Sequence, residues 1–277
     1  MKYKTKKIKI YSENNEFQHA EVLKRNRVKR SKNKKFFVEG VNSINLAIEN
    51  NWSIDAFLYS DYEKLSDWAK TILKKSIAKK HIEMPNSLLE KLSDKENRSE
   101  LIALIEMKSD SLDRIKIKKD LFVVVIDRAS SPGNLGTIIR SCNSFGVDAI
   151  IMTGHSVDLY DPKTIRASVG TLFSIPIIRL ESQNDLLSFI KKVKSKRGNL
   201  NVIGTSVKTE ETISNTKFER PLMLLIGNET YGLSSNYKNL CNKLVKIPIF
   251  GSASSLNVAC ATSIFLYEIN TKKIIEK

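Results

Sequence analysis

The chain has 277 residues, which is long enough for two domains. Its composition, with 41% hydrophobic and 27% charged residues and a formal net charge of +16, is that of an ordinary globular protein. No apolar run approaches the roughly 18 to 20 residues that a membrane-spanning helix needs, so we expect no such span. The three cysteines and three histidines lack the spacing of a zinc site, and we expect no metal and reduced thiols in the cytoplasm.

The positive charge is concentrated at the N-terminus. Residues 1–40 contain 13 Lys or Arg against 4 Asp or Glu, whereas residues 41–120 contain 14 of each. Such density favours a polyanionic partner, because each phosphate that is neutralised releases counterions. A solvated face without function is the alternative, and membrane-surface binding is less favoured because the run lacks the apolar face of an interfacial helix. We treat residues 1–34 as a basic N-terminal arm.

Short strands and helices alternate over residues 35–107. Strand-like stretches are FFVEG (36–40), SIDAFLYS (53–60), HIEM (81–84) and ELIALIEM (100–107). Helical spacing is found at residues 41–51, 61–80 and 86–94, with Asn86 as the expected cap of the third helix. The alternation predicts a small α/β domain. Residues 108–119 are charged without a periodic apolar face, so we expect a linker there.

Stronger strands follow from residue 120 to residue 277. Six apolar runs succeed one another, namely LFVVVID (121–127), DAIIMT (148–153), SIPIIRL (174–180), NVIGTS (201–206), PLMLLIG (221–227) and KLVKIPI (243–249). Helices are expected at 136–146, 162–170, 183–196 and 254–273. Continuous apolar runs suit strands buried on both faces, so we predict a parallel sheet with helices on each side. The last helix is apolar around most of its circumference and must be buried by the sheet, by another subunit, or by both.

Three turns rich in Gly, Asn and Ser join these strands to helices. They are SSPGNLGTIIR (130–140), LLIGNETYGLS (224–234) and IPIFGSASSLNVA (247–259). Because the carboxyl ends of parallel strands lie at one edge of a sheet, the three turns can converge there. Each alone could be only a turn, but three together, with an arginine and a glutamate, favour a site. A dinucleotide-dependent oxidoreductase is disfavoured, since the full glycine fingerprint and its later acidic residue are missing.

The three turns resemble, in order and spacing, the motifs of the SpoU family of RNA ribose methyltransferases, which belong to the knotted superfamily that uses S-adenosylmethionine. The basic run into FFVEG and the later LEKLSDKENRSELIALIE are similar to the family's ribosomal-protein-like RNA-binding domain. The resemblance implies an α/β catalytic domain over residues 120–277 with a parallel sheet and a deep trefoil knot. It also implies an RNA-binding α/β domain over residues 35–107, a homodimer through the C-terminal domain, and methyl transfer to a ribose 2′-hydroxyl.

The resemblance also assigns roles to residues. The expected catalytic set is Arg140, Asn134, Glu229, Ser255 and Asn257. The expected cofactor-binding set, which would hold S-adenosylmethionine mostly through backbone contacts, is Thr205, Ser206, Gly227, Asn228, Ile247 and Leu256. The arm would bind RNA through Arg25, Arg27, Lys29, Arg30 and Lys32. Arg140 suits gripping a phosphate beside the target ribose, and whether it also removes the hydroxyl proton stays open.

The sequence departs from the family pattern at one place. Many members follow the glutamate of the second motif with glycine, whereas Thr230 and Tyr231 precede Gly232 here, and we expect Tyr231 to shape the entrance for RNA or donor. Ribosomal RNA is the favoured substrate because the added domain resembles a ribosomal protein. A tRNA 2′-O-methyltransferase, or a non-catalytic RNA-binding or ribosome-assembly protein on the same fold, remains an alternative.

Overall fold

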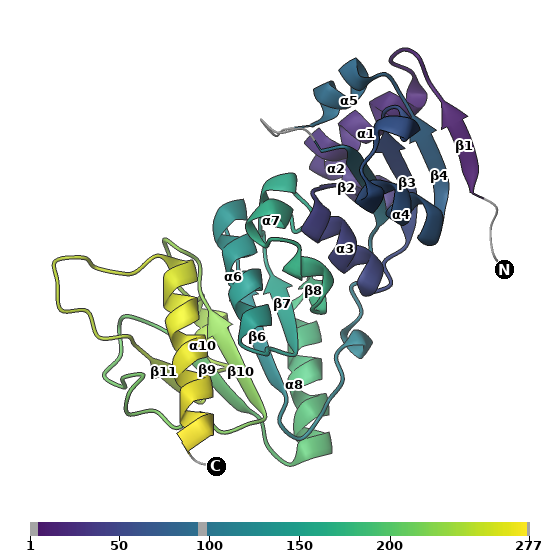
Figure 1. Ribbon diagram of the computed structural model, residues 1–277. Coiled ribbons are helices and arrows are strands. Elements are labelled where there is room, and N and C mark those ends of the chain that lie inside the picture. Colours follow the sequence, from purple (N-terminus) through teal and green to yellow (C-terminus); the bar gives the residue numbers. More distant parts are fainter. Residues whose placement is uncertain (1–4, 94–98, 276–277) are drawn as a thin grey trace. The chain divides into compact units, whose positions relative to one another are not determined.

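The computed structural model describes residues 5–93 and 99–275, which form two compact units (Figure 1). The first unit comprises Met1–Lys108 and Asp158–Ser174, and the second comprises Ser109–Val157 and Ile175–Lys277. Among the described residues, we find no helix with the length and hydropathy that crossing a bilayer requires.

The first unit is built on a mixed five-stranded sheet in the order β1-β4-β3-β5-β2. These strands are β1 (Lys6–Lys9), β2 (Lys35–Glu39), β3 (Ile54–Tyr59), β4 (Ala78–Glu83) and β5 (Leu101–Glu106). The helical elements are α1 (Asn15–Arg25), α2 (Arg27–Asn33), α3 (Val41–Glu49), η1 (Tyr62–Lys64), α4 (Asp67–Lys75), α5 (Asn86–Leu92), α7 (Pro162–Ala167) and η3 (Thr171–Phe173). β1, β4 and β3 run parallel, whereas β5 is antiparallel to both β3 and β2.

Two element boundaries in this unit differ from the sequence prediction. The helix expected over residues 61–80 ends at Lys75, because Ala78 is buried and the following residues pair with both β1 and β3. Tertiary strand pairing therefore overrides the local helical spacing. Asn86 is not the cap of α5, since the cap position is Pro85 and the Asn86 amide donates a hydrogen bond to Glu90 instead.

The division of the chain also differs from the predicted one. Residues 5–34 are not a separate arm: they form β1, α1 and α2, and Phe17 of α1 is buried in the core of the first unit. Residues 158–174 lie within the predicted catalytic stretch, yet they belong to the first unit. Aromatic contacts explain this, because Tyr160 stacks on Phe36 with ring centroids 4.3 Å apart and Trp52 donates a hydrogen bond to the Phe173 carbonyl.

The second unit contains a six-stranded sheet in the order β11-β9-β10-β6-β7-β8. The strands are β6 (Phe122–Asp127), β7 (Ala149–Thr153), β8 (Ile177–Leu180), β9 (Asn201–Thr205), β10 (Leu222–Ile226) and β11 (Lys243–Val245). The helical elements are η2 (Leu112–Arg114), α6 (Pro132–Ser144), α8 (Gln183–Arg197), α9 (Ser235–Lys238) and α10 (Val258–Ile275). Every neighbouring pair of strands is parallel, which confirms the prediction of a parallel sheet.

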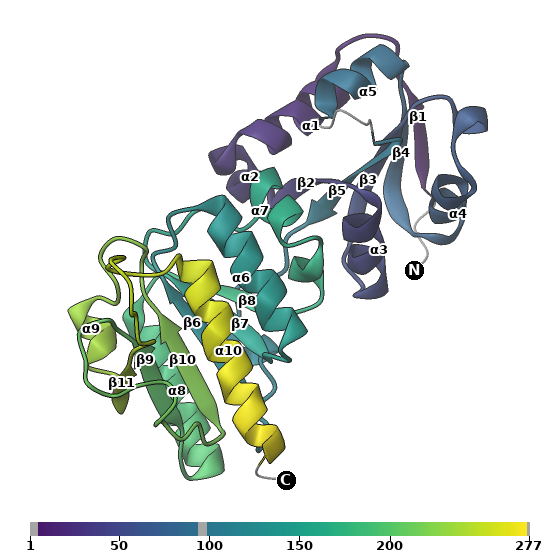
Figure 2. The same cartoon turned by 60° about the vertical axis from the view of Figure 1, so that its left-hand side comes forward.

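Helices cover both faces of this sheet. α8 packs on one face, where Phe189 and Val193 join Val123 and Val125 in a buried cluster. α6 and α10 contact each other and lie side by side over the opposite face, as both views show (Figures 1 and 2). The path of the chain brings the start of α10 to the edge of the sheet where β6 and β10 end. The trefoil knot that the resemblance implies stays a prediction.

Candidate functional site

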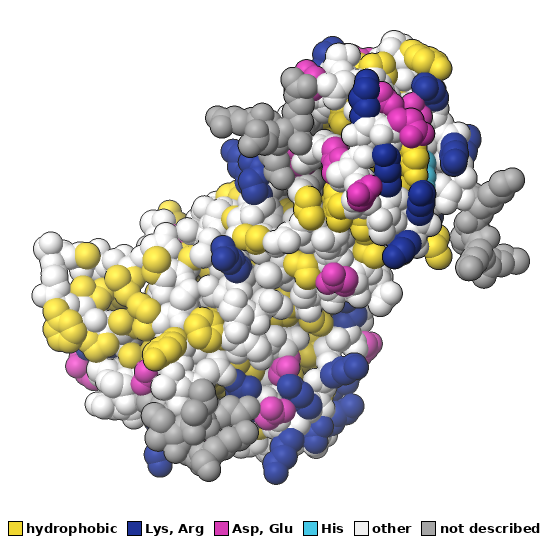
Figure 3. Space-filling view, viewed as in Figure 1, with side chains coloured by type: hydrophobic (Ala, Val, Ile, Leu, Met, Phe, Trp, Pro, Cys, Tyr) yellow, Lys and Arg dark blue, Asp and Glu magenta, His cyan; other side chains and the backbone are white. Residues whose placement is uncertain are grey.

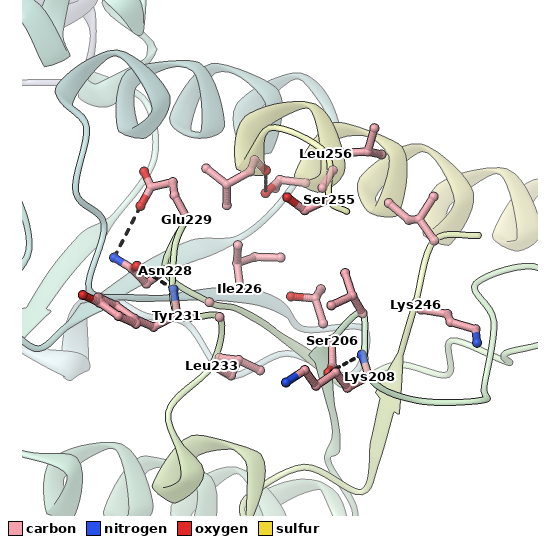
Figure 4. A pocket seen from close by; sticks show the side chains of 18 of the residues that line it. Ser206, Lys208, Ile226, Asn228, Glu229, Tyr231, Leu233, Lys246, Ser255 and Leu256 are labelled. Atoms are coloured by element: carbon pink, nitrogen blue, oxygen red, sulfur yellow. Dashed lines mark hydrogen bonds between the residues drawn. The ribbon is translucent and has the colours of Figure 1, made fainter. Parts of the chain in front are cut away.

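A cavity of about 380 Å³ lies where β9, β10 and β11 end and α10 begins. Its wall contains eight of the predicted residues, namely Thr205, Ser206, Gly227, Asn228, Glu229, Ile247, Ser255 and Leu256. Figure 4 shows the Ile226 side chain between the loop that carries Ser206 and Lys208 and the segment that carries Ser255 and Leu256. Segments that are far apart along the chain therefore share one cavity.

Glycine is required where β10 enters the second motif. A Cβ atom at Gly227 would lie 2.2 Å from the backbone nitrogen of Leu233, which no real contact allows. The close approach follows from the tight turn after it, in which the backbones of Asn228 and Gly232 exchange hydrogen bonds of 3.1 and 2.9 Å. Gly227 thus lets the turn fold back on the strand and leaves the cavity lined by backbone at this point.

The Asn228 side chain holds this turn in shape. Its carbonyl oxygen accepts hydrogen bonds from the backbone amides of Thr230 and Tyr231, at 2.9 and 3.1 Å. Its amide group donates to the Arg128 carbonyl at 2.7 Å, which ties the second motif to the end of β6. Asn228 is therefore a structural part of the cavity wall as much as a candidate ligand contact.

Hydrogen bonds join all three motifs through their polar side chains. The Asn134 amide of the first motif donates to the Glu229 carboxylate of the second at 3.1 Å, and the Asn257 amide of the third donates to the Asn134 carbonyl oxygen, also at 3.1 Å. Glu229 also accepts from the Ser130 hydroxyl at 2.6 Å. Asn257 in turn accepts a hydrogen bond from the backbone amide of Ala259 at the start of α10, at 2.9 Å. We call the linked side chains of Glu229, Asn134 and Asn257 the relay.

The electrostatics of this relay follow from Glu229. Its partial burial alone would raise the pKa of the Glu229 carboxyl, but hydrogen bonds from Ser130, Asn134 and backbone amides outweigh this effect and hold the pKa below its ordinary value. Glu229 is therefore ionised at neutral pH and accepts hydrogen bonds on both oxygens. A fixed carboxylate of this kind orients donors around it and does not itself serve as an acid at that pH.

An ion pair between the buried Asp127 and the half-buried Arg128 supports the site, and sequence reasoning missed it. Asp127, at the end of β6, is 1% exposed and holds the Arg128 guanidinium with two hydrogen bonds of 3.0 Å. Asp127 also accepts a hydrogen bond from the Ser234 backbone amide, and Arg128 donates to the Gly232 carbonyl, so the pair fastens the C-terminal end of the second motif. The signal was visible as a charged Asp-Arg step directly after a buried strand.

Arg140 does not line the cavity. It lies on α6, its side chain is exposed, and within the described part of the chain its guanidinium has no hydrogen bond or ion pair. The neighbouring Ser141 hydroxyl forms a 2.8 Å hydrogen bond with the Ser263 hydroxyl of α10, which fixes the two helices against each other. An exposed guanidinium without a partner among the described residues is suited to an external anion such as a phosphate.

The predicted RNA-binding residues divide into two groups. Arg25, Arg27, Lys29 and Lys32 are exposed on α1 and α2. Arg30 is not available to RNA, because it is 2% exposed and its guanidinium bonds Asp158 at 2.7 Å and the carbonyl oxygens of Leu23 and Lys24. The assignment of Arg30 to RNA binding is therefore wrong. A buried guanidinium needs partners on every side, and Asp158 lies too far along the sequence for this pairing to be foreseen.

Family comparisons cover both parts of the chain. The SpoU rRNA Methylase family matches residues 121–267, and the SpoU L30e-like domain matches residues 14–103. A 23S rRNA (uridine(2479)-2′-O)-methyltransferase of Streptomyces viridochromogenes is 39% identical over 96% of this chain and 93% of its own length.

Solved structures agree with these matches. The SpoU methyltransferase AviRb from Streptomyces viridochromogenes, in complex with the cofactor AdoMet, aligns with a TM-score of 0.90 at 39% identity, over 95% of this chain and 99% of that one. An AdoMet-bound rRNA methyltransferase from Sinorhizobium meliloti aligns with a TM-score of 0.83 at 25% identity, over 96% and 98% of the two chains.

Proposed function

We propose, because this chain belongs to the SpoU rRNA methylase family, that it transfers a methyl group from S-adenosylmethionine to a ribose 2′-hydroxyl of 23S rRNA. The observation that carries this proposal is the hydrogen-bonded relay of Glu229, Asn134 and Asn257 at the rim of the cavity. The relay unites the three motifs that the family shares. Similarity to a 23S rRNA 2′-O-methyltransferase over nearly the whole chain supports the same substrate class.

The cavity suits S-adenosylmethionine, whose chemistry when bound is to present an electrophilic methyl group on a sulfonium. Ile226, Leu233 and Phe265 provide an apolar surface for a planar base. The lysines at 208, 238 and 246 can face a carboxylate. Gly227 adds no side chain to the cavity wall, so backbone forms the wall at this point. We therefore assign donor binding to this cavity, including the predicted Thr205, Ser206, Asn228, Ile247 and Leu256.

The acceptor side of the reaction falls to the relay and to Arg140. Arg140 would grip a phosphate next to the target ribose, since its guanidinium is exposed and free of acidic partners within the described residues. Ser255 lines the cavity and would position the ribose, while Glu229 and Asn257 hold the surrounding loops in register. Alignment of donor, acceptor and leaving group is a large part of the rate of such a transfer.

The proton on the ribose hydroxyl must leave as the new bond forms. Arginine stays protonated in proteins, so Arg140 fits better as the group that binds the phosphate than as the base, and the proton passes to solvent water as the methyl group is transferred. Glu229 is ionised, but its oxygens already accept hydrogen bonds from Ser130 and Asn134. We therefore give Glu229 a positioning role and no part in proton removal.

Exposed basic side chains on α1 and α2 and an exposed apolar stripe on α10 suit two kinds of partner. Arg25, Arg27, Lys29 and Lys32 would contact the RNA backbone, and this role places the protein in the cytoplasm with the ribosomes.

We also propose a homodimer through α10. Cys260, Ile264 and Tyr267 form an exposed stripe at helical spacing on this helix, and hydrophobic side chains gather over α10 and the preceding loop (Figure 3). A second copy would bury this stripe and so account for an apolar helix face in water.

Radiolabelled methyl incorporation tests the proposal directly. RNA from cells that lack the protein is incubated with purified protein and labelled S-adenosylmethionine, and the labelled nucleotide is mapped. Label in a 23S rRNA ribose is the expected result, whereas label in tRNA would point to a tRNA 2′-O-methyltransferase. No label, together with no affinity for S-adenosylmethionine, would instead indicate a non-catalytic RNA-binding protein.

A further inference from the structure

The first unit contains a cavity of its own, with a volume of about 430 Å³. This is within the range of roughly 300 to 1,000 Å³ that small-molecule sites occupy. The cavity is lined by residues of β1, β3, β4, η1 and α4, namely Lys7, Ile8, Lys9, Tyr59, Tyr62, Leu73, Lys74, His81 and Glu83. None of these residues takes part in the methyl-transfer site described above.

The strand register explains why these side chains meet. In the parallel strands β1, β4 and β3, Lys7 lies opposite His81, and His81 lies opposite Phe57. Two residues further on, Lys9, Glu83 and Tyr59 form the next row. Because alternate residues of a strand point to the same face, both rows lie on one side of the sheet. A cationic edge strand therefore stands beside a histidine and an aromatic strand.

His81 is a buried polar residue whose hydrogen bonding is incomplete. It is 7% exposed, and its Nε2 atom is buried with no hydrogen-bond partner in the described part of the chain. Its ring packs edge-on against Phe57 and Tyr59, with centroids 5.9 and 6.3 Å apart. Buried polar atoms in proteins nearly always have a partner, so a polar ligand in the cavity that this ring lines would complete its surroundings.

The charges around the cavity favour a ligand with both an anionic and a planar part. Burial, assisted by the positive charge of Lys7, lowers the pKa of the His81 imidazole, so the ring is neutral at pH 7 and offers one donor and one acceptor. Glu83 forms a 2.9 Å ion pair with Lys9. Lys7 and Lys74 are exposed and have no acidic partner among residues 5–93 and 99–275. Figure 3 shows Lys and Arg side chains gathered over β1, β4 and α4 around a histidine.

We propose that this cavity binds one unpaired nucleotide of the RNA substrate. Tyr62 provides a ring for stacking by the base, His81 provides polar atoms for the base edge, and Lys7 and Lys74 face the adjoining phosphates. Aromatic stacking combined with lysines that follow the backbone is the general mode by which proteins hold single-stranded RNA. An acidic peptide would use the lysines but would leave the aromatic wall and the neutral imidazole without a role.

This inference rests on the proposed function only in that the ligand is taken from an RNA substrate. Binding is followed by NMR of protein labelled with ¹³C in its histidine rings, which gives few signals because the chain has three histidines. The probe is a set of short single-stranded RNA oligonucleotides of mixed sequence. The His81 ring signals should shift on titration, and signals that stay unchanged at saturating oligonucleotide would overturn the proposal.

Variants locate the contact. Tyr62→Ala should weaken oligonucleotide binding about 5- to 150-fold through loss of stacking. Lys74→Ala should reduce the slope of log affinity against log salt by about 0.7, the value for one phosphate contact to a single strand. Lys75→Ala is the matched control, since Lys75 is exposed on the same helix but does not line the cavity. Equal effects of Lys74→Ala and Lys75→Ala would refute a defined site.

Methyl transfer separates this inference from the proposed function. Tyr62→Ala should raise KM for an rRNA fragment and leave kcat and S-adenosylmethionine affinity unchanged. If the wild-type protein transfers methyl groups but the His81 signals do not move, the nucleotide site is refuted and the enzyme stands. If oligonucleotides move those signals but no RNA is methylated, the proposed function fails and the nucleotide site stands.

Discussion

Replacement of Asn134 by Ala or by Asp tests two properties of the relay: the hydrogen bonds that Asn134 makes and the negative charge of Glu229 that it faces. Asn134→Ala removes a hydrogen bond donated to the Glu229 carboxylate and one accepted from Asn257. Net values are about 1.5 to 3 kcal/mol for a bond to a charged group and about 0.5 to 1.5 kcal/mol for a neutral one. Water replaces part of both at this partly exposed site, so we expect the free energy of unfolding to fall by about 1 to 2 kcal/mol.

In Asn134→Asp the new side chain has almost the same shape as asparagine but carries a negative charge. The new carboxylate can still accept from Asn257, but it faces Glu229, and two unit charges 4 Å apart repel by about 4 kcal/mol at the effective dielectric constant of a protein surface. Screening at this site reduces that figure. We expect the Asp variant to be less stable than the Ala variant by about 1 to 2 kcal/mol near pH 8.

The pH dependence gives the decisive comparison. In the wild type, the hydrogen bonds that depress the pKa of Glu229 stabilise the fold above the ordinary carboxyl pKa, and this stabilisation is lost as pH falls through the folded-state pKa. In Asn134→Asp, the like charge raises the pKa of the carboxyl pair. The repulsion therefore destabilises the fold above that raised pKa and is relieved as pH falls below it, when the pair shares a proton.

Urea unfolding and single-turnover methyl transfer between about pH 5 and pH 8 measure both effects. The deficit of Asn134→Asp should shrink on acidification, and its methyl-transfer rate should recover relative to wild type. The difference in free energy of unfolding between Asn134→Ala and the wild type should change little over this pH range. Parallel pH profiles for the two variants would refute the contact between Asn134 and an ionised Glu229.

Three further predictions concern residues outside this contact. Arg140→Ala should abolish methyl transfer and leave S-adenosylmethionine affinity within about twofold, because Arg140 does not line the donor cavity; near-wild-type turnover would contradict its role. Gly227→Ala should weaken donor binding by at least about tenfold, measured by calorimetry, since its Cβ would collide with the backbone of the turn. Arg30→Ala should lower the free energy of unfolding by about 3 to 5 kcal/mol in urea, whereas exposed Arg25→Ala should change it by less than about 0.5 kcal/mol.

Local pattern was sufficient for most of the second unit. Its six apolar runs became six parallel strands, because residues such as Val123 and Val124 are both buried, on opposite faces of one sheet. The first unit was harder to predict at its edges. The residues Ala78 to Lys80 have helical spacing with the preceding helix, yet they pair with β1 and β3, and no local signal records that partner strands are available.

Charge density alone misled the assignment of Arg30. Five basic residues between Arg25 and Lys32 were treated as one surface, although helix geometry turns one of every three or four side chains inward. Arg30 is that residue, and its position is stable only because Asp158, from a distant segment, reaches it. Asp158 begins the segment of residues 158–174, which belongs to the first unit. Sequence reasoning lacked both facts for one reason: a pairing over 128 positions leaves no periodic trace.

The convergence of the three motifs could be predicted, whereas the contacts between them could not. Parallel strands end at one edge of a sheet in any strand order, so the motifs had to lie near each other. That Glu229 meets Asn134 depends on β10 lying next to β6, with Leu222 opposite Phe122 across a separation of 100 positions. Asn257 joins them because α10 packs along α6. The relay is therefore a property of strand order and helix packing, and a change that alters either one should uncouple the motifs even when every motif residue is kept.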